Sequence, residues 1–201
     1  MRRLLTPICA LFLVSCNTYI PSNTENICQI FDGNLGWYKD VKITRKRWGI
    51  PAHITMAIVY QESSYRAKAR PKRPTFFFIS LPRRSSAYGY AQAQDPAWND
   101  YRRETGKWGH DRDDFGDAVN FIGWYSNKSS EVLGISKWDA YSQYLAYHEG
   151  WTGYRNQSFK KKPSLMKVAE KVRRVSSQYG KQLEKCEGRL EKKNNKWWFL
   201  R

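Results

Sequence analysis

Glu62 is the residue whose position most clearly suggests chemistry, because it follows an apolar stretch over residues 54–60. A carboxylate at the end of a buried helix is costly unless it is paired or protonated. A protonated Glu in a partly apolar cleft can donate a proton to a glycosidic oxygen. Two later motifs could complete a site around it: residues 88–92, Tyr-Gly-Tyr-Ala-Gln, and residues 146–150, Ala-Tyr-His-Glu-Gly. Together these residue types indicate acid catalysis on a polysaccharide.

Helical periodicity predicts the elements that must position these motifs. We place helix starts where a capping residue or a first-turn proline precedes apolar residues at helical spacing. The predicted starts are Pro51, Asp95, Asp113 or Asp114, Ser136 and Ser164, and the predicted stops include Gly106 and Gly150. Residues 75–81, Thr-Phe-Phe-Phe-Ile-Ser-Leu, are the one strand candidate. We therefore expect a mainly α fold with a possible small β-hairpin.

The start of the chain has the pattern of an export signal. Two arginines precede an apolar run over residues 4–14, which is too short to span a bilayer. The run ends in Leu-Val-Ser-Cys, which resembles the bacterial lipobox. That resemblance implies export, cleavage after Ser15 and acyl chains on Cys16, and Asn17 favours anchoring to the periplasmic face of the outer membrane. An ordinary signal peptide with an incidental cysteine is the alternative.

The charge of the chain limits the class of partner. The formal net charge is +17. Removal of residues 1–15 would take away two arginines and no acidic residue, which leaves about +15 by the same count. Such a surplus indicates a polyanionic partner: nucleic acid, anionic lipid or an acidic wall polymer. Export and the lack of a recognisable nucleic-acid motif argue against the first.

The four cysteines are assigned by their positions in the chain. Cys9 lies in the signal and Cys16 at the predicted lipidation site, which leaves Cys28 and Cys186 in the folded part. Two cysteines left in an oxidising compartment are most simply a disulfide. The three histidines are not at ligand spacing, so we expect no metal site and no cofactor.

The chain divides into four segments by composition. Residues 1–15 are the signal peptide, and the polar residues 16–26 form a lipidated tether. Residues 27–186 are long enough for one domain. Residues 187–201 form a basic tail that ends in Trp-Trp-Phe-Leu-Arg. That tail is either disordered or docked on the domain or the membrane surface.

Four short motifs in order resemble the soluble lytic transglycosylase family, whose lysozyme-like (goose-type/lytic transglycosylase) helical domain cleaves peptidoglycan. Residues 61–65, Gln-Glu-Ser-Ser-Tyr, are similar to the family's catalytic Glu-Ser motif. Residues 89–92 match its Gly-Leu-Met-Gln motif at Gly and Gln. Asn120 with Gly123 matches a later helix, and residues 146–150 resemble Ala-Tyr-Asn-x-Gly with His in place of Asn. The resemblance covers about residues 37–175.

This resemblance implies a mechanism with one carboxyl group. Glu62 would protonate the oxygen that links MurNAc to the next GlcNAc, then take the proton from the MurNAc C6 hydroxyl. That hydroxyl would attack C1 of its own sugar and give a 1,6-anhydro end without water. Desolvation would keep Glu62 protonated near neutral pH. Tyr147 resembles the family tyrosine that hydrogen-bonds the catalytic Glu, although an aromatic-rich helix could also place it in the core.

The resemblance also implies residues that contact the glycan. Gln92, Gly89 and the backbone at Tyr90 would line the cleft and bind N-acetyl groups. Ser63 would bind the sugar, or its hydroxyl would satisfy backbone groups at the helix end. Asn120 is predicted as a cleft residue, with simple exposure on a helix as the alternative.

Two departures from the family pattern leave alternatives open. Residues 70–84 form a basic, aromatic insertion that is either a flap over the cleft or a surface hairpin with solvated charges. The last motif carries His148 and Glu149, which are more polar than the family pattern. Glu149 is expected to point away from the side on which Tyr147 lies.

Three functions remain open at this point. We favour a lytic transglycosylase that acts on peptidoglycan strands. A muramidase of the same fold would need a second acid to activate water, for which Asp95 or Asp111 is a candidate. A weakly catalytic lipoprotein that binds peptidoglycan or organises an envelope assembly is the third. The presence of both Glu62 and Tyr147 argues against an inactive scaffold, and the aromatic content suits stacking on sugars.

Overall fold

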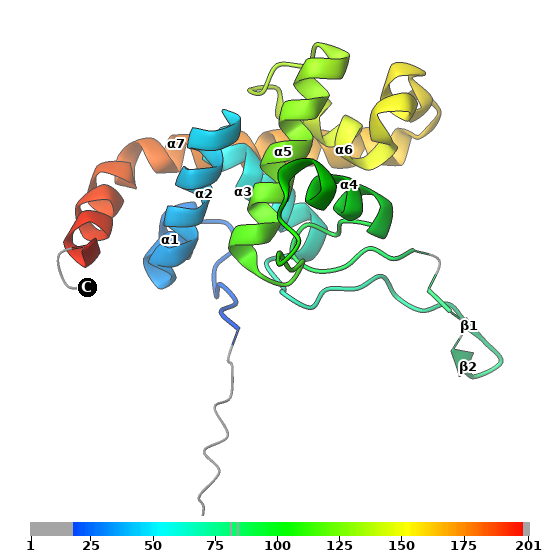
Figure 1. The fold of residues 1–201 in the computed structure, drawn as a ribbon, viewed down its shortest axis with the longest axis horizontal. Helices are drawn as coiled ribbons and strands as arrows, with labels where there is room; N and C mark the ends of the chain where they lie inside the picture. The colour runs from blue at the N-terminus through cyan, green and yellow to red at the C-terminus, as the bar shows by residue number, and fades with distance from the viewer. Residues whose placement is uncertain (1–17, 81, 84, 199–201) are drawn as a thin grey trace, which may run out of the picture.

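Helices make up most of the molecule in the computed structural model, which describes residues 18–80, 82–83 and 85–198 (Figure 1). The elements in chain order are α1 (Ile27–Gly33), α2 (Leu35–Trp48), α3 (Ala52–Ser63), β1 (Thr75–Phe76), β2 (Ile79–Ser80), α4 (Asp95–Thr105), α5 (Phe115–Leu133), α6 (Ala140–Arg155), the 3₁₀-helix η1 (Ser158–Lys161) and α7 (Pro163–Trp198). The prediction of a mainly helical, lysozyme-like domain is confirmed.

Helix α3 lies at the centre because its sequence is apolar on nearly every side. Ile54 and the four residues 56–59 have no exposed surface. A helix that is hydrophobic all round is buried all round, and α3 accordingly contacts α2, α5 and α7. The polar end of this helix is where Glu62 lies.

Helices α2 and α5 approach closely because a glycine lies between them. A Cβ atom on Gly123 would lie 2.5 Å from the Trp48 ring and 2.6 Å from the Thr44 methyl group. Any larger residue there would force the two helices apart. Gly123, which the sequence analysis placed in a family motif, therefore serves packing.

Helix α7 runs along one side of the molecule and contacts α1, α3 and α6 (Figure 1). Its buried face includes Ala169, Val172, Tyr179 and Leu190. The helix continues without a break past Cys186, where we had placed the end of the domain. Leu190 is fully buried, so part of the predicted tail packs on the domain.

A disulfide joins the two ends of the described fold, as predicted. Cys28 in α1 bonds to Cys186 in α7 across 158 residues of chain. Next to it, the Ile27 amide donates to the Gln182 side chain at 2.9 Å. Arg189 and Lys193 of α7 form ion pairs with Asp32 of α1. The N-terminal helix is thus held on α7 by covalent and polar contacts.

The predicted helix ends agree with the structure at some positions and differ at others. Asp114 caps α5 and Gly106 ends α4, as expected. The start at Ser136 is wrong: α6 begins at Ala140, capped by Asp139, which accepts from the Ser142 amide. Ser136 instead accepts from the Trp138 amide, so its side chain makes a local turn.

Two further ends are shifted, and two helices were missed. Asp95 lies inside α4, one residue after its N-cap, and Pro51 is itself the N-cap of α3. Gly150 does not end α6, but it leaves helical geometry there (φ 73°, ψ 164°) and produces a kink. Helices α1 and α2 were not predicted, although the side chains of Asn26 and Asn34 cap their first turns.

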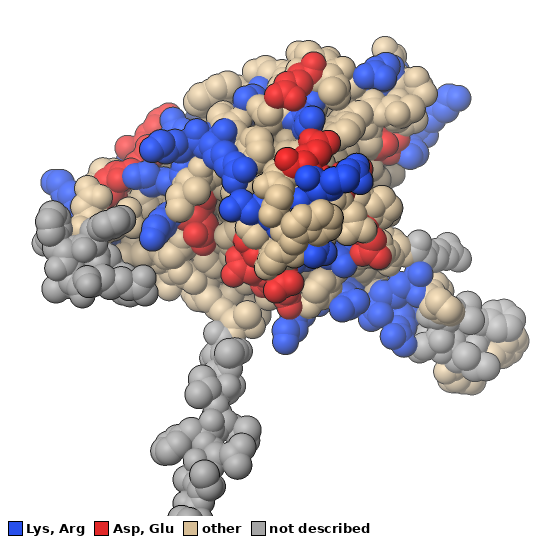
Figure 2. Space-filling model, viewed as in Figure 1, with Lys and Arg blue, Asp and Glu red and all other residues tan. Residues whose placement is uncertain are grey.

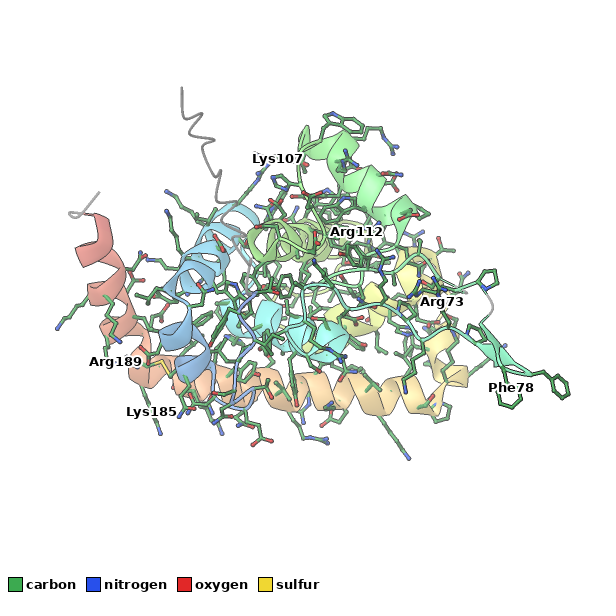
Figure 3. All side chains as sticks on the ribbon, turned by 90° about the horizontal axis from the view of Figure 1, so that it is seen from below. Arg73, Phe78, Lys107, Arg112, Lys185 and Arg189 are labelled. Carbon is green, nitrogen blue, oxygen red and sulfur yellow. A yellow bond between two sulfur atoms is a disulfide. The ribbon has the colours of Figure 1, made fainter. Side chains whose placement is uncertain are left out.

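The insertion at residues 70–84 contains a short hairpin. Strands β1 and β2 pair antiparallel, with Thr75 opposite Ser80. The hairpin extends away from the helices, with Phe78 at its outer end (Figures 1 and 3). The candidate strand over 75–81 is therefore two short strands within its described part. Within the described ranges, no helix is long and apolar enough to cross a membrane.

Candidate active site

Glu62 lies in the last turn of α3, where the chain turns sharply away. Ser64 follows in a left-handed conformation (φ 49°), and its amide donates to the Tyr60 carbonyl. Part of the Glu62 surface remains open to solvent, yet protein atoms crowd its carboxyl group. Burial raises the pKa of Glu62 to about 7, and a hydrogen bond with Tyr144 offsets part of that rise. The carboxyl can therefore carry a proton near neutral pH.

Tyr144 is the hydrogen-bonding partner of Glu62, and the sequence analysis missed it. Its side chain is almost fully buried in α6, and Glu62 together with burial raises its pKa. Tyr144 lies three residues before Tyr147, so both tyrosines face the same side of α6. That i, i+3 spacing was the signal in the sequence that could have identified it.

Tyr147 has a different partner from the predicted one. Its hydroxyl donates to the Ala91 carbonyl at 2.6 Å. A tyrosine has one O–H to donate, so the prediction that it hydrogen-bonds Glu62 is not met in this structure. Tyr147 is still close enough for the Glu62 charge to raise its pKa, after the larger effect of burial. It therefore joins α6 to the Gly89–Gln92 loop beside Glu62.

A pocket of about 290 Å³ opens next to Tyr147. Its walls come from the loop before α4, the start of α4, the middle of α5 and the kinked part of α6. The lining residues are Gln92, Ala93, Gln94, Pro96, Ala97, Phe121, Tyr125, Tyr147, His148, Glu149 and Gly150. Tyr125 stacks on Trp151 at 5.0 Å and meets Tyr147 edge-on at 5.2 Å. Aromatic walls with a few polar groups suit a sugar ring.

The Gly89–Gln92 loop has a backbone shape that its sequence requires. Gly89 has φ +78°, and a Cβ there would lie 1.9 Å from the Arg112 carbonyl oxygen. Only glycine fits this position. Gln92 also has a positive φ (48°), and its amide nitrogen donates to the Ala69 and Gly89 carbonyls. Gln92 lines the pocket, and its NH₂ group holds the loop.

Three residues that were predicted to contact the glycan make contacts within the fold instead. The Tyr90 ring is buried against Trp37, and its amide donates to the Arg112 carbonyl. Ser63 is 1% exposed and donates to the Val59 carbonyl at 3.1 Å, which is the helix-end alternative. Neither group is placed to contact a sugar here.

Asn120 is the third, and it lies in the core between α2 and α5. Its side-chain oxygen accepts from the Trp48 indole at 3.0 Å and from the Tyr101 hydroxyl at 3.2 Å. Asn120 is therefore not among the residues that line the pocket beside Tyr147. A buried amide of this kind specifies helix packing.

Glu149 also lines the pocket, but it belongs to a polar network that does not include Glu62. Its side chain is 3% exposed and is held by Lys162 at 2.8 Å, by Ser158 and by His148. Burial would raise the pKa of Glu149, but these partners outweigh it and lower the pKa to about 2. The network ties the kinked end of α6 to η1 and the start of α7.

The two candidates for a second acid lie in another cavity. Asp95 forms an ion pair with Arg112 at 2.8 Å. Asp95 and Asp111 both line a polar pocket of about 540 Å³ on the other side of the first turn of α4. Neither of them lines the pocket beside Tyr147. Among the described residues, no cluster of His, Cys, Asp and Glu could hold a metal ion.

A helical domain with a protonatable glutamate at a helix end, next to a tyrosine that lines an aromatic pocket, has the architecture of lysozyme-like, glycan-cleaving proteins. Residues 4–186 match the model of the family described as Transglycosylase SLT domain. Because the match covers most of the chain, the protein belongs to this family, as the motifs predicted. No curated protein and no solved structure matches the chain. Membership supports action on peptidoglycan of the lytic transglycosylase type.

Proposed function

We propose that the protein cleaves the β-1,4 bond between MurNAc and GlcNAc and leaves a 1,6-anhydroMurNAc end. The observation that carries this proposal is Glu62: burial raises the pKa of its carboxyl to about 7, and its neighbour Tyr147 lines a sugar-sized aromatic pocket. A general acid works best when its pKa lies near the working pH. Family membership supplies the substrate class.

The reaction needs two proton transfers through one residue. Protonated Glu62 gives its proton to the glycosidic oxygen as the bond from C1 to that oxygen breaks. The GlcNAc end leaves as an alcohol, and C1 becomes electron-poor. The Glu62 carboxylate then takes the proton from the C6 hydroxyl while that oxygen bonds to C1. The carboxyl ends the cycle protonated, so no external acid, base or water is consumed.

The surroundings of Glu62 support this order of events. Low solvation favours the protonated form before bond cleavage. The Tyr144 hydroxyl stabilises the carboxylate formed after the first transfer, because a donor hydrogen bond favours the charged form. Intramolecular attack by a tethered hydroxyl has a high effective concentration, so a second carboxylate is not required.

Product masses after digestion of peptidoglycan test the reaction type. The full chain carrying Cys16→Ser is incubated with purified sacculi, beside the same chain carrying Glu62→Gln. The matched control is Glu184→Gln, which removes an exposed carboxylate of α7. We expect products lighter by one water than hydrolytic ones from the parent and the control, and none from Glu62→Gln. Reducing-end products of full mass would identify a muramidase and contradict the proposal.

We also propose that the mature protein is a lipoprotein anchored to the outer membrane through Cys16. The support is the lipobox-like sequence, which lies outside the described residues. Metabolic labelling with a fatty acid, followed by membrane fractionation, tests it. Label on the parent chain and none on Cys16→Ser is the expected result. An unlabelled parent chain cleaved near the same position would indicate an ordinary signal peptide.

A further inference from the structure

The tip of the β1–β2 hairpin exposes two large apolar side chains. Phe77 is 79% exposed and Phe78 is 104% exposed, the highest fractions among the described large hydrophobic residues. Both have positive φ, 43° and 68°, in a turn that usually selects Asn or Gly. A bulky residue in this conformation costs on the order of 1 kcal/mol. Two exposed aromatic rings at a turn that is costly for phenylalanine indicate that they serve a contact with something else.

The chain around the hairpin carries positive charge alone. Residues 63–94 contain Lys or Arg at seven positions and no Asp or Glu. These positions are Arg66, Lys68, Arg70, Lys72, Arg73, Arg83 and Arg84. Figure 2 shows basic side chains gathered where the hairpin leaves the helices. Residues 41–61 and 150–169 are also free of acidic residues, with four and five Lys or Arg, but the hairpin stretch has the most. The hairpin region therefore favours an anionic partner.

The charges lie behind the apolar tip and not beside it. Arg83 donates to the Pro71 carbonyl at 3.1 Å, so the two legs of the hairpin stay close at this level. Lys72 and Arg73 are exposed on the opposite leg. Strand geometry puts Arg73 roughly 15 Å behind the turn, and Figure 3 shows it closer to the helices than Phe78.

We propose that this hairpin inserts its tip into an anionic lipid bilayer. Phe77 and Phe78 would enter the boundary between headgroups and acyl chains, which lies about 5–10 Å deep for interfacial segments. Lys72, Arg73 and Arg83 would then lie at the level of the lipid phosphates. A protein partner fits less well, because stable protein interfaces need about 800 Å² from each side. Two side chains on a narrow projection do not offer that area.

Insertion would set the orientation of the candidate active site. Ala69 precedes the basic leg, and its carbonyl accepts from the Gln92 side chain at 2.9 Å and from the Gly89 amide at 3.0 Å. The base of the hairpin is thus joined to the loop that forms one wall of the pocket. A bilayer that holds the tip would hold this wall at a fixed height above the membrane. The contact is independent of the lipid on Cys16 and of the proposed reaction.

Vesicle co-sedimentation tests the proposal with the full chain carrying Cys16→Ser. One vesicle set contains phosphatidylglycerol with phosphatidylethanolamine, and the other contains phosphatidylcholine alone. We expect stronger binding to the anionic set. Phe78→Ser should lower the partition coefficient about tenfold, and Lys72→Gln with Arg73→Gln about 25-fold, with the loss shrinking at high salt.

Matched variants separate the hairpin from general effects of surface and charge. Trp138→Ser removes another exposed aromatic residue, and Lys160→Gln with Lys161→Gln removes two other exposed cations. These controls should bind as the parent does, and the apolar N-terminal run is common to all chains. Equal binding by tip variants and parent would overturn the proposal. So would an unchanged vesicle affinity together with weaker binding of the tip variants to purified sacculi, which would make the hairpin a wall contact.

Discussion

Two carboxyl groups of the same domain, Glu62 and Glu149, are both crowded by protein, but their pKa values are shifted in opposite directions. The pKa of Glu62 is raised to about 7, whereas that of Glu149 is lowered to about 2. Burial raises the pKa in both cases. The difference is that Glu62 has one neutral hydrogen-bonding partner, Tyr144, while Glu149 has the Lys162 ammonium group, Ser158 and His148.

The comparison shows that the hydrogen-bonding and ionic partners of a buried carboxyl, and not burial alone, determine whether its pKa is raised or lowered. A carboxyl kept neutral can donate a proton, and one kept ionised can hold a structure together. The position of Glu62 after an apolar stretch indicated its role, but the partners that keep Glu149 ionised could not be read from the sequence. Glu62 is therefore the catalytic candidate and Glu149 a structural residue.

The largest expected effect is on activity, and it separates the two acids. Glu62→Gln should reduce the rate on purified peptidoglycan about a thousandfold, because it removes the proton donor. Glu149→Gln should stay within about tenfold of the parent, because Gln keeps the shape of the side chain. Rates of soluble product release measure both. Equal losses for the two variants would mean that the roles assigned from their surroundings are wrong.

The next effect is on stability at high pH. The pKa of Glu62 is raised on folding from its ordinary value of 4.5 to about 7. This group therefore favours folding fully below about pH 4.5, and the benefit is lost as the pH rises through 7. Glu62→Gln should stabilise the protein by up to about 3 kcal/mol at pH 8.5 and by little at pH 4. Urea unfolding at the two pH values measures the difference, and a variant less stable than the parent at pH 8.5 would contradict it.

Glu149 should show the reverse dependence on pH. Because its folded pKa is lowered to about 2, its contribution is present above about pH 4.5 and is lost as the pH falls through 2. Glu149→Gln should cost about 2 kcal/mol at neutral pH, since Lys162 loses its partner and stays half-exposed. The cost should vanish near pH 2. Thermal unfolding of both chains across this range is the measurement, with Glu184→Gln as the control.

The smallest effects distinguish the two tyrosines of α6. Tyr144→Phe removes the hydrogen bond that lowers the pKa of Glu62, so that pKa should rise. The alkaline limb of the pH–rate profile should therefore move to higher pH. Tyr147→Phe leaves the Ala91 carbonyl, which has no exposed surface, without its donor and should cost about 1 kcal/mol of stability. If Tyr147→Phe moved the alkaline limb of the pH–rate profile instead, the predicted hydrogen bond between Tyr147 and Glu62 would be supported.

Much of the fold could be predicted from the sequence because its signals are local. The caps at Asp114 and Gly106 and the central apolar stretch of α3 can each be recognised within a few residues. The disulfide is not local, and it was predicted because only two cysteines were left in the folded part. The helix start predicted at Ser136 was wrong because a serine side chain can cap a turn as well as a helix. The Gly150 kink was expected as a helix end for the same reason, since a positive φ can interrupt a helix that continues beyond it.

The site was predicted less completely because it depends on partners far apart in the chain. The position of Glu62 at a helix end was visible in the sequence. Its hydrogen bond with Tyr144 was not, because it joins α3 to α6, which are far apart in the chain. Asn120 looked like a cleft residue only by motif, while its contacts with Trp48 and Tyr101 are tertiary. Tyr147 was placed correctly beside the pocket, and only its hydrogen-bonding partner differed.

The disulfide near the start of the fold also determines how the protein would bear mechanical load. A pull on residue 18 would first strip the hydrogen bonds that Tyr19, Thr24 and Glu25 make with α1 and α7. It would then reach Cys28, whose covalent bond passes the force directly to Cys186 in α7. The force thus passes through the covalent bond into α7 and bypasses the contacts of α1 with α2. The end of α3 that carries Glu62 would keep its geometry under tension that peels away the N-terminal segment.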